Sequence, residues 1–361
     1  MTLPRPARAR RPRAAALILV GLAALGLVAI APAAEPGDAP LPAGAFDVEV
    51  RATPLTSFKR GSPETRFGAL EWLGGLELSS PVRHFGAFSG IATADKGRDL
   101  LLLTDNGFWL AARLESGPDG KPLAVGSARM AVMRDSDGRP LLGKDDADAE
   151  SLAIRPAEGG FEALVGFEER HRVLRFRATG PFPGGVLGTR GERFAALWNE
   201  QKPMRWSKGL ESLAIVPPGL MGDAVAVGLS EAPPRGERLG YGYIFRPRGF
   251  DRFRFVLRDD YDPTDATFTP EGDLLVLERR FTIASGVGAR IRRVRAGTIA
   301  PGAVVDAEVI FEADLSDQID NMEGIALDVA EDGRRILTLV SDDNRSILQR
   351  TLLLRFRLRD D

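Results

Sequence analysis

Three short stretches of the sequence share one pattern, a carboxylate followed by an apolar run. They are DAESLAI at Asp148–Ile154, GLESLAI at Gly209–Ile215 and NMEGIAL at Asn321–Leu327. Asp265, in TDATFTPEGDLLVLERR, precedes a similar run, and Ser89, in FSGIATADKGRDLLLLTDN, begins a copy that lacks the acid. Measured between Ser89, Glu150, Glu211, Asp265 and Glu323, the spacings are 61, 61, 54 and 58 residues. The chain therefore contains five similar periods.

Each period holds short apolar runs separated by Gly-containing turns, with room for four strands. Periods of this length with four strands are typical of a β-propeller, because radial stacking buries both faces of every sheet. The sequence predicts an all-β fold, with five blades favoured by the repeat count and six as the alternative. We expect FGALEWLGGLEL (Phe67–Leu78) to supply the outer strand that the last period lacks. Such a strand would close the ring and remove an open sheet edge.

The first residues differ from the rest. The opening MTLPRPARARRPR carries five Arg and no acid, an apolar run fills 14–31, and Ala31-Pro32-Ala33 follows. This is the pattern of a secretory signal peptide over 1–34, and a retained membrane anchor is the alternative. We expect 35–66 to form a linker with an edge strand, and 67–361 to form the propeller domain. The folded part is then periplasmic or secreted, with no membrane association once the leader is removed.

Charge and cysteine content narrow the class of partner. The chain has 48 Lys and Arg against 50 Asp and Glu, so removal of the leader's five Arg leaves a net charge of −7. A net-acidic protein is poorly suited to binding nucleic acid, because neutralising phosphates requires a basic surface. The chain contains no Cys, so stability must come from core burial and not from disulfides. We expect a monomer that binds a small molecule.

Propeller geometry explains the repeated acid. The innermost strand of a blade begins at one face of the ring, and the second strand returns to that face. The repeat therefore pairs Glu150 with Glu168, Glu211 with Glu231, Asp265 with Glu278, and Glu323 with Asp342 at one central opening. Crowded carboxylates resist ionisation, and calcium, which takes six to eight oxygen ligands, relieves this. The expected ligands of a Ca²⁺ ion are Asp105, Asn106, Glu150, Glu168, Glu211, Asp265, Glu278, Glu323 and Asp342.

Further acids in the loops before the inner strands, such as Asp146, Asp148 and Asp320, are also explained by turn formation. Glu150, Glu211 and Glu323 are the candidates for a general base. Basic residues follow the second acid in three periods, and Arg170, Arg279 and Arg345 are the candidates for binding an anionic substrate. The alternative is that these arginines only keep the rim soluble.

The chain has only two His, and His171 falls where the repeat predicts the opening, so it is a further catalytic candidate. With no Cys and two distant His, a zinc site of His and Cys ligands is excluded. Neither a G-x-S-x-G elbow nor a phosphate-binding G-x-x-x-x-G-K loop is present in the sequence.

The ordered set LEWLGGLELSS, FGAFSGIAT, LLLLTDNGFW, DAESLAI, GLESLAI, NMEGIAL and SDDN resembles the phytase-like family, exported bacterial proteins described as having esterase-like activity. The resemblance covers roughly Phe67 to Phe356. It implies a propeller, an ester-hydrolase activity on a phosphoric or carboxylic ester, and kinship with calcium-dependent propeller phytases. It assigns no catalytic residue. The alternatives are a non-catalytic propeller that binds a ligand or a protein, and a lactonase-like enzyme.

Overall fold

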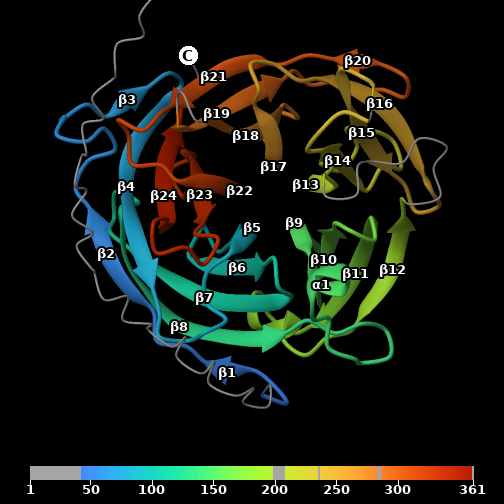
Figure 1. Ribbon diagram of the computed structural model, residues 1–361, viewed down its shortest axis with the longest axis horizontal. Coiled ribbons are helices and arrows are strands. Elements are labelled where there is room, and N and C mark those ends of the chain that lie inside the picture. The colour runs from blue at the N-terminus through green and yellow to red at the C-terminus, as the bar shows by residue number, and fades with distance from the viewer. Residues whose placement is uncertain (1–41, 198–207, 235, 283–285, 360–361) are drawn as a thin grey trace, which may run out of the picture. The chain divides into compact units, whose positions relative to one another are not determined.

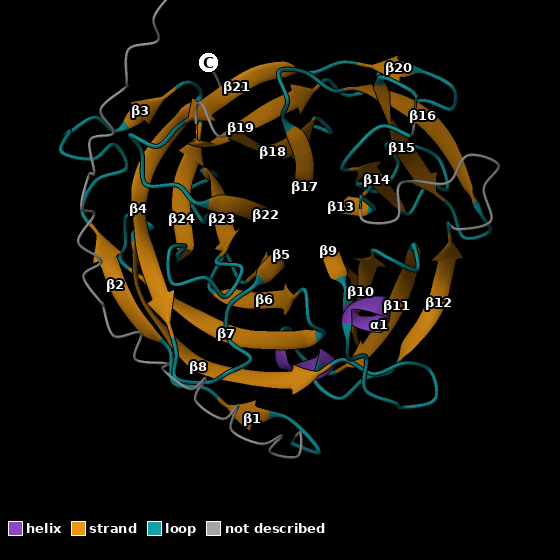
Figure 2. Ribbon diagram, viewed as in Figure 1, coloured by secondary structure: helices purple, strands orange, loops and turns teal. Residues whose placement is uncertain are grey.

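Five sheets surround a common centre in the computed structural model, which describes residues 42–197, 208–234, 236–282 and 286–359 (Figure 1). Strands make up almost all of the regular structure (Figure 2). The all-β class and the five-bladed propeller predicted from the repeat are confirmed.

The first three blades each begin with an innermost strand, from which the others follow outward. Blade 1 contains β5 (Phe88–Ala94), β6 (Asp99–Thr104), β7 (Phe108–Ser116), β8 (Pro122–Val132) and β1 (Phe46–Asp47). Blade 2 contains β9 (Ala149–Ala157), β10 (Gly160–Phe167), β11 (Arg172–Thr179) and β12 (Gly191–Ala196). Blade 3 contains β13 (Leu210–Ile215), β14 (Ala226–Ser230), β15 (Leu239–Phe245), β16 (Phe250–Val256) and β20 (Val304–Val305).

The last two blades follow the same plan. Blade 4 contains β17 (Asp262–Phe268), β18 (Leu274–Thr282), β19 (Gly286–Val294) and β21 (Glu308–Ala313). Blade 5 contains β22 (Asn321–Val329), β23 (Arg335–Asp342), β24 (Thr351–Leu358), β4 (Leu70–Ser79) and β2 (Arg51–Leu55), with β3 (Arg66–Phe67) paired to β4. In the described ranges the helices are α1 (Lys144–Ala147), before β9, and the 3₁₀ turn η1 (Gly184–Val186).

Blade 5 joins the two ends of the domain. Strand β4 pairs antiparallel with β24, from Leu70 opposite Leu358 to Leu78 opposite Thr351. This is the outer strand expected from 67–78. The described part of the expected linker also joins sheets, since β1 pairs with β8 and β2 pairs with β4. The ring is therefore closed by hydrogen bonds between segments far apart in the chain.

The hydrophobic core lies between neighbouring blades and not within any one of them. Blades 1 and 2 share a cluster that includes Leu103, Trp109 and Phe176, with the rings of Trp109 and Phe176 packed edge to face at 5.1 Å. Similar clusters join blades 2 and 3, blades 3 and 4, and blades 4 and 5. This arrangement explains the near-continuous apolar runs of the inner strands, which are covered on both faces.

The expected signal peptide, 1–34, lies outside the described residues. Within the part of the chain that the structure describes, no helix is both long enough and apolar enough to cross a membrane.

Candidate active site

Each innermost strand carries a β-bulge near its beginning. The register with the second strand slips by one residue at this point in all five blades. A bulge leaves one residue unpaired and re-aims its side chain. The residues passed over by the pairing are Ser89, Glu150, Glu211, Thr264 and Glu323. In three blades the repeated acid of the sequence is therefore the bulge residue, which explains why it is not part of the apolar alternation.

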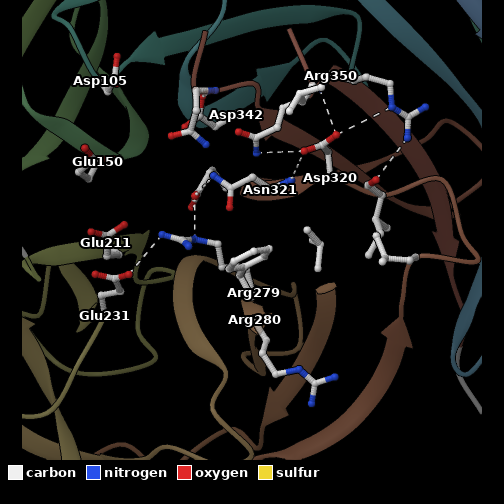
Figure 3. A pocket seen from close by; sticks show the side chains of 18 of the residues that line it. Asp105, Glu150, Glu211, Glu231, Arg279, Arg280, Asp320, Asn321, Asp342 and Arg350 are labelled. Atoms are coloured by element: carbon white, nitrogen blue, oxygen red, sulfur yellow. Dashed lines mark hydrogen bonds and ion pairs between the residues drawn. The ribbon is translucent and has the colours of Figure 1, made fainter. Parts of the chain in front are cut away.

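In each blade, one polar residue in the second strand or directly after it lies beside the bulge of the first strand. It pairs with the residue two positions before the bulge. It is an acid in four blades and an arginine in blade 4. These residues are Asp105, Glu168, Glu231, Arg279 and Asp342. All five line one cavity of about 770 Å³, together with Glu150, Glu211 and Glu323 (Figure 3). The structure thus brings together six of the nine expected ligands, and it adds Glu231.

Blade 4 departs from the expected pairing. Asp265, taken from the repeat as the marker, is buried and accepts hydrogen bonds from the backbone N–H groups of Ile325 and Ala266, both at 2.8 Å. Glu278 is fully buried and pairs with Arg290 and Arg292, the latter at 2.9 Å. Neither is among the residues that line the cavity. The expected register was off by one residue, and such an offset turns every side chain of a strand to its other face.

Besides His171, three other expected site residues lie outside the set that lines the cavity. Asn106 pairs through its backbone with Asp148, and its side-chain oxygen accepts a hydrogen bond from Thr104 Oγ1 at 2.9 Å. Arg170 is exposed and forms an ion pair with Asp146 at 2.8 Å. Arg345 lies on an exposed turn with a φ of 52°. Of the three candidate arginines, Arg279 is the one that lines the cavity.

His171 is buried beside this site without lining it. A Cβ built on Gly209 would lie 2.9 Å from both Glu168 Cγ and His171 Nδ1, so the two side chains meet at that glycine. The backbone N–H of Gly209 also donates to Glu168 Oε1. Gly209 thus lets the backbone approach and hold the Glu168 carboxylate, while His171 packs behind it.

Arg279 crosses the centre of the cavity from β18. Its guanidinium contacts Glu323 at 2.8 Å and Glu231 at 3.3 Å, which places it between blades 3 and 5 (Figure 3). The carboxylate of Glu323, followed by those of Glu231 and other acids, raises the pKa of Arg279 against the effect of burial. Lys208 also pairs with Glu231 and, at 3.4 Å, with Asp262. These two cations neutralise the blade 3 and blade 5 side of the cluster.

The acids of the cluster are crowded and largely withdrawn from water. Burial, followed by the nearby Glu168 and Asp148, raises the pKa of Glu150 well above its ordinary value. Burial, followed by Glu231 and Glu150, does the same to the pKa of Glu211. Burial also raises the pKa of Glu323 to about 8 and that of Asp342 to about 7. Without a cation, this cluster holds protons near neutral pH.

The donor set fits a hard divalent cation. Glu168, Glu211 and Glu231 each offer a carboxylate oxygen, and these atoms lie within 4.8 Å of one another. Calcium is coordinated by oxygen ligands of this kind. Neither His of the chain is among the residues that line the cavity, so nothing here favours a softer metal.

Part of this site was not recognised from the sequence. Glu231 was paired with Glu211 by the repeat but was absent from the expected ligands. The sequence feature that could have identified Glu231 as a site residue is its position directly after the second strand of the third period. Thr264 carries no such signal, because the acid beside it resembles the marker of the other periods.

The chain belongs to the phytase-like family. The family's sequence profile, described as "Esterase-like activity of phytase", matches residues 83–345. This confirms the resemblance drawn from the repeated motifs. Among curated proteins no significant match is found.

Similar solved structures have low sequence identity. A gluconolactonase from Xanthomonas campestris is 12% identical, with a TM-score of 0.38, over 85% of this chain and 97% of that one. A thermostable family-43 glycoside hydrolase is 9% identical, with a TM-score of 0.47, over 76% of this chain and 91% of that one. A putative glucose dehydrogenase from Thermus thermophilus is 14% identical, with a TM-score of 0.31, over 74% of this chain and 96% of that one. Similarities at this level carry no inference about activity.

Proposed function

We propose that the protein is an exported ester hydrolase that acts at a calcium ion held by the acids of the central cavity. Membership of the phytase-like family supports the reaction class. The observation that carries the proposal is the convergence of Glu168, Glu211 and Glu231 within 4.8 Å in a cavity that also contains Glu150 and Glu323. The export is proposed from the leader-like sequence at 1–34.

The oxygen ligands would come from Glu168, Glu211 and Glu231. Asp105 and Asp342 line the same cavity and would add negative charge around the ion. A bound divalent ion supplies polarisation of the ester oxygen and a lower pKa for a bound water. Gly209 fixes the Glu168 carboxylate through its backbone N–H. His171, the further catalytic candidate of the sequence, meets Glu168 at Gly209 and would position that carboxylate.

Glu150 is the preferred general base. Within the described part of the chain it forms no ion pair with Lys or Arg, in contrast to Glu231 and Glu323. Water adds to the acyl carbon while its proton passes to Glu150, and that proton is then given to the leaving oxygen as the C–O bond breaks. Arg279 holds Glu323 and Glu231 in place and offers positive charge to the oxyanion that develops.

A closed set of salt bridges would favour a non-catalytic propeller. Arg279 closes part of the cavity in this way, together with Lys208. Glu150, Glu168 and Glu211 form no ion pair with Lys or Arg in the described ranges. Glu231 pairs with Lys208 and Arg279 through Oε1, so its Oε2 can still face a cation on their side. This asymmetry favours the metal-dependent enzyme over the binding module.

The test is calcium-dependent turnover of a panel of esters: 4-nitrophenyl acetate, 4-nitrophenyl phosphate and a δ-lactone, each with Ca²⁺ or EDTA. We expect turnover of at least one ester in Ca²⁺ and its loss in EDTA. Glu211→Gln should weaken calcium binding in a calorimetric titration by about tenfold or more. Glu158→Gln, which changes an exposed acid outside the cluster, is the matched control. Unchanged calcium affinity in Glu211→Gln, or no turnover of any ester, would contradict the proposal.

A further inference from the structure

The cavity has a second half in which apolar side chains replace most of the carboxylates. Beyond Arg279, over blades 4 and 5, five apolar side chains line it beside Asp320 and Arg350. The apolar ones are Phe281, Val287, Leu315, Ile319 and Leu348. Figure 3 shows the two sides, with Glu150, Glu211 and Glu231 on one side of Arg279 and Arg350 on the other. Both halves line the same cavity, so a single molecule can contact both.

Three of these apolar side chains are unusually exposed, and we call them the apolar rim. Phe281 is 71% exposed, Leu315 is 55% exposed and Leu348 is 87% exposed. A single exposed apolar residue is ordinary. Three large ones at the opening of one polar cavity form a patch of the kind that contacts a ligand.

Hydrogen bonds hold the turns that carry two residues of the apolar rim, Leu315 and Leu348. Asp320 accepts from the Arg350 backbone N–H at 3.1 Å and from Gln349 Nε2 at 3.2 Å, which fixes the turn next to Leu348. The turn that carries Leu315 is closed by Asp314, which accepts from the Ser316 backbone N–H at 2.8 Å. Because these turns are already ordered, a ligand that contacts them loses little free energy to loop ordering.

Charge also separates the two halves. In the acidic half, Arg279 and Lys208 are already paired with carboxylates. That half therefore offers poor binding to a substrate that carries many negative charges. On the apolar side, Arg350 is likewise paired, with Glu77 at 3.7 Å and Asp320 at 3.9 Å, and Arg280 stacks on the ring of Tyr261 at 4.6 Å. A substrate of low charge with an apolar portion matches this distribution.

We propose that the apolar rim binds the acyl chain of a carboxylic ester while the ester group lies against the acidic half. The proposal rests on the ester-hydrolase function and narrows it to substrates with an apolar acyl group. Phe281, Leu315 and Leu348 are its specificity-determining residues. Short acyl esters would reach the acidic half without touching the apolar rim.

The experiment compares 4-nitrophenyl butyrate with 4-nitrophenyl octanoate in saturating Ca²⁺. Each buried methylene is expected to contribute about fourfold, so partial burial of four more should lower the KM of the octanoate by at least about tenfold. The double variant Phe281→Ser, Leu348→Ser should raise the KM of the octanoate by a similar factor and leave that of the butyrate unchanged. Leu123→Ser, which changes an exposed leucine of β8, is the matched control.

Failure of this proposal can be told apart from failure of the function. If the double variant hydrolyses both esters as the wild type does, the apolar rim is not an acyl site, while the hydrolase stands. If no ester is hydrolysed, titration of free octanoate and butyrate by calorimetry decides the matter. Tighter octanoate binding that the double variant loses supports the rim, and equal binding overturns it. A change in sedimentation coefficient in the double variant would mean that the rim joins two copies of the chain, which also overturns the proposal.

Discussion

At the scale of single residues, the site depends on one position at which an arginine replaces an acid. Four blades present an acid from the second strand, and blade 4 presents Arg279 instead. Its guanidinium lies between Glu231 and Glu323, which come from the blades on either side. One cation among so many carboxylates reduces their repulsion, and it also lowers the attraction of the cavity for a second cation.

Arg279→Gln should therefore have opposite effects on stability and on calcium binding. Without calcium, the midpoint of thermal unfolding should fall, because Glu323 loses its cationic partner and Glu231 keeps only Lys208, while both stay buried. Calcium affinity should rise severalfold, because a positive charge leaves the site. Differential scanning calorimetry in EDTA and calorimetric titration with Ca²⁺ measure the two effects. Arg170→Gln, which changes an exposed arginine outside the cavity, should alter neither. A fall in both quantities would show that Arg279 serves to shape the cation site.

At the scale of elements, blade closure joins β4 to β24. Trp72 of β4 lies opposite Phe356 of β24, and their rings pack at 5.2 Å. Phe58 packs against the same pair, at 5.4 Å from Trp72 and 5.0 Å from Phe356. This aromatic cluster holds the strand that completes the ring.

Trp72→Ala should lower the free energy of unfolding by about 3–5 kcal/mol, because it empties a buried aromatic site. Urea unfolding monitored by circular dichroism measures the loss. Phe281→Ala, which shortens a mostly exposed aromatic residue, should change stability by less than about 1 kcal/mol. If the two variants unfold at the same urea concentration, the aromatic cluster does not stabilise the pairing of β4 with β24.

The elements also show what the sequence could reveal. The repeat of an acid before an apolar run was enough to predict five blades and the closing strand at 67–78. It could not reveal that these positions are bulges, because the sequence does not show which residue of the first strand is left unpaired by the second. In blade 4 this led to Asp265 and Glu278 in place of Thr264 and Arg279. Asp265 also precedes an apolar run, and only the pairing of β17 with β18 distinguishes the two registers.

At the scale of the whole molecule, the buried acids link stability to pH. Burial raises the pKa of Glu150, Glu211 and Asp265 well above their ordinary values, that of Glu323 to about 8 and that of Asp342 to about 7. Between about pH 5 and 8 the folded protein therefore binds protons that the unfolded chain has released. Burial lowers the pKa of His84, so the folded protein binds fewer protons at this residue than the unfolded chain does. This is one group against several acids.

In EDTA the free energy of unfolding should decrease as the pH rises from 5 to 8, by on the order of 1 kcal/mol per pH unit. Excess calcium should remove or reverse the decrease, since a cation stabilises the ionised carboxylates. Urea unfolding at several pH values, with EDTA or Ca²⁺, measures both trends. Acids with lowered pKa values, such as Asp306 and Glu162, act below this range. Stability that is constant or rising between pH 5 and 8 in EDTA would contradict the assignment of the cluster.

The hydrogen bonds between β4 and β24 have a consequence for biosynthesis. Strand β4 emerges early from the ribosome, but its partner is made only when residues 351–358 are added. Until then two unpaired strand edges are exposed, and such edges promote association with other chains. A chain interrupted shortly before residue 351 would thus contain four complete blades and still be prone to aggregate, so quality control of this protein should depend on its last strand.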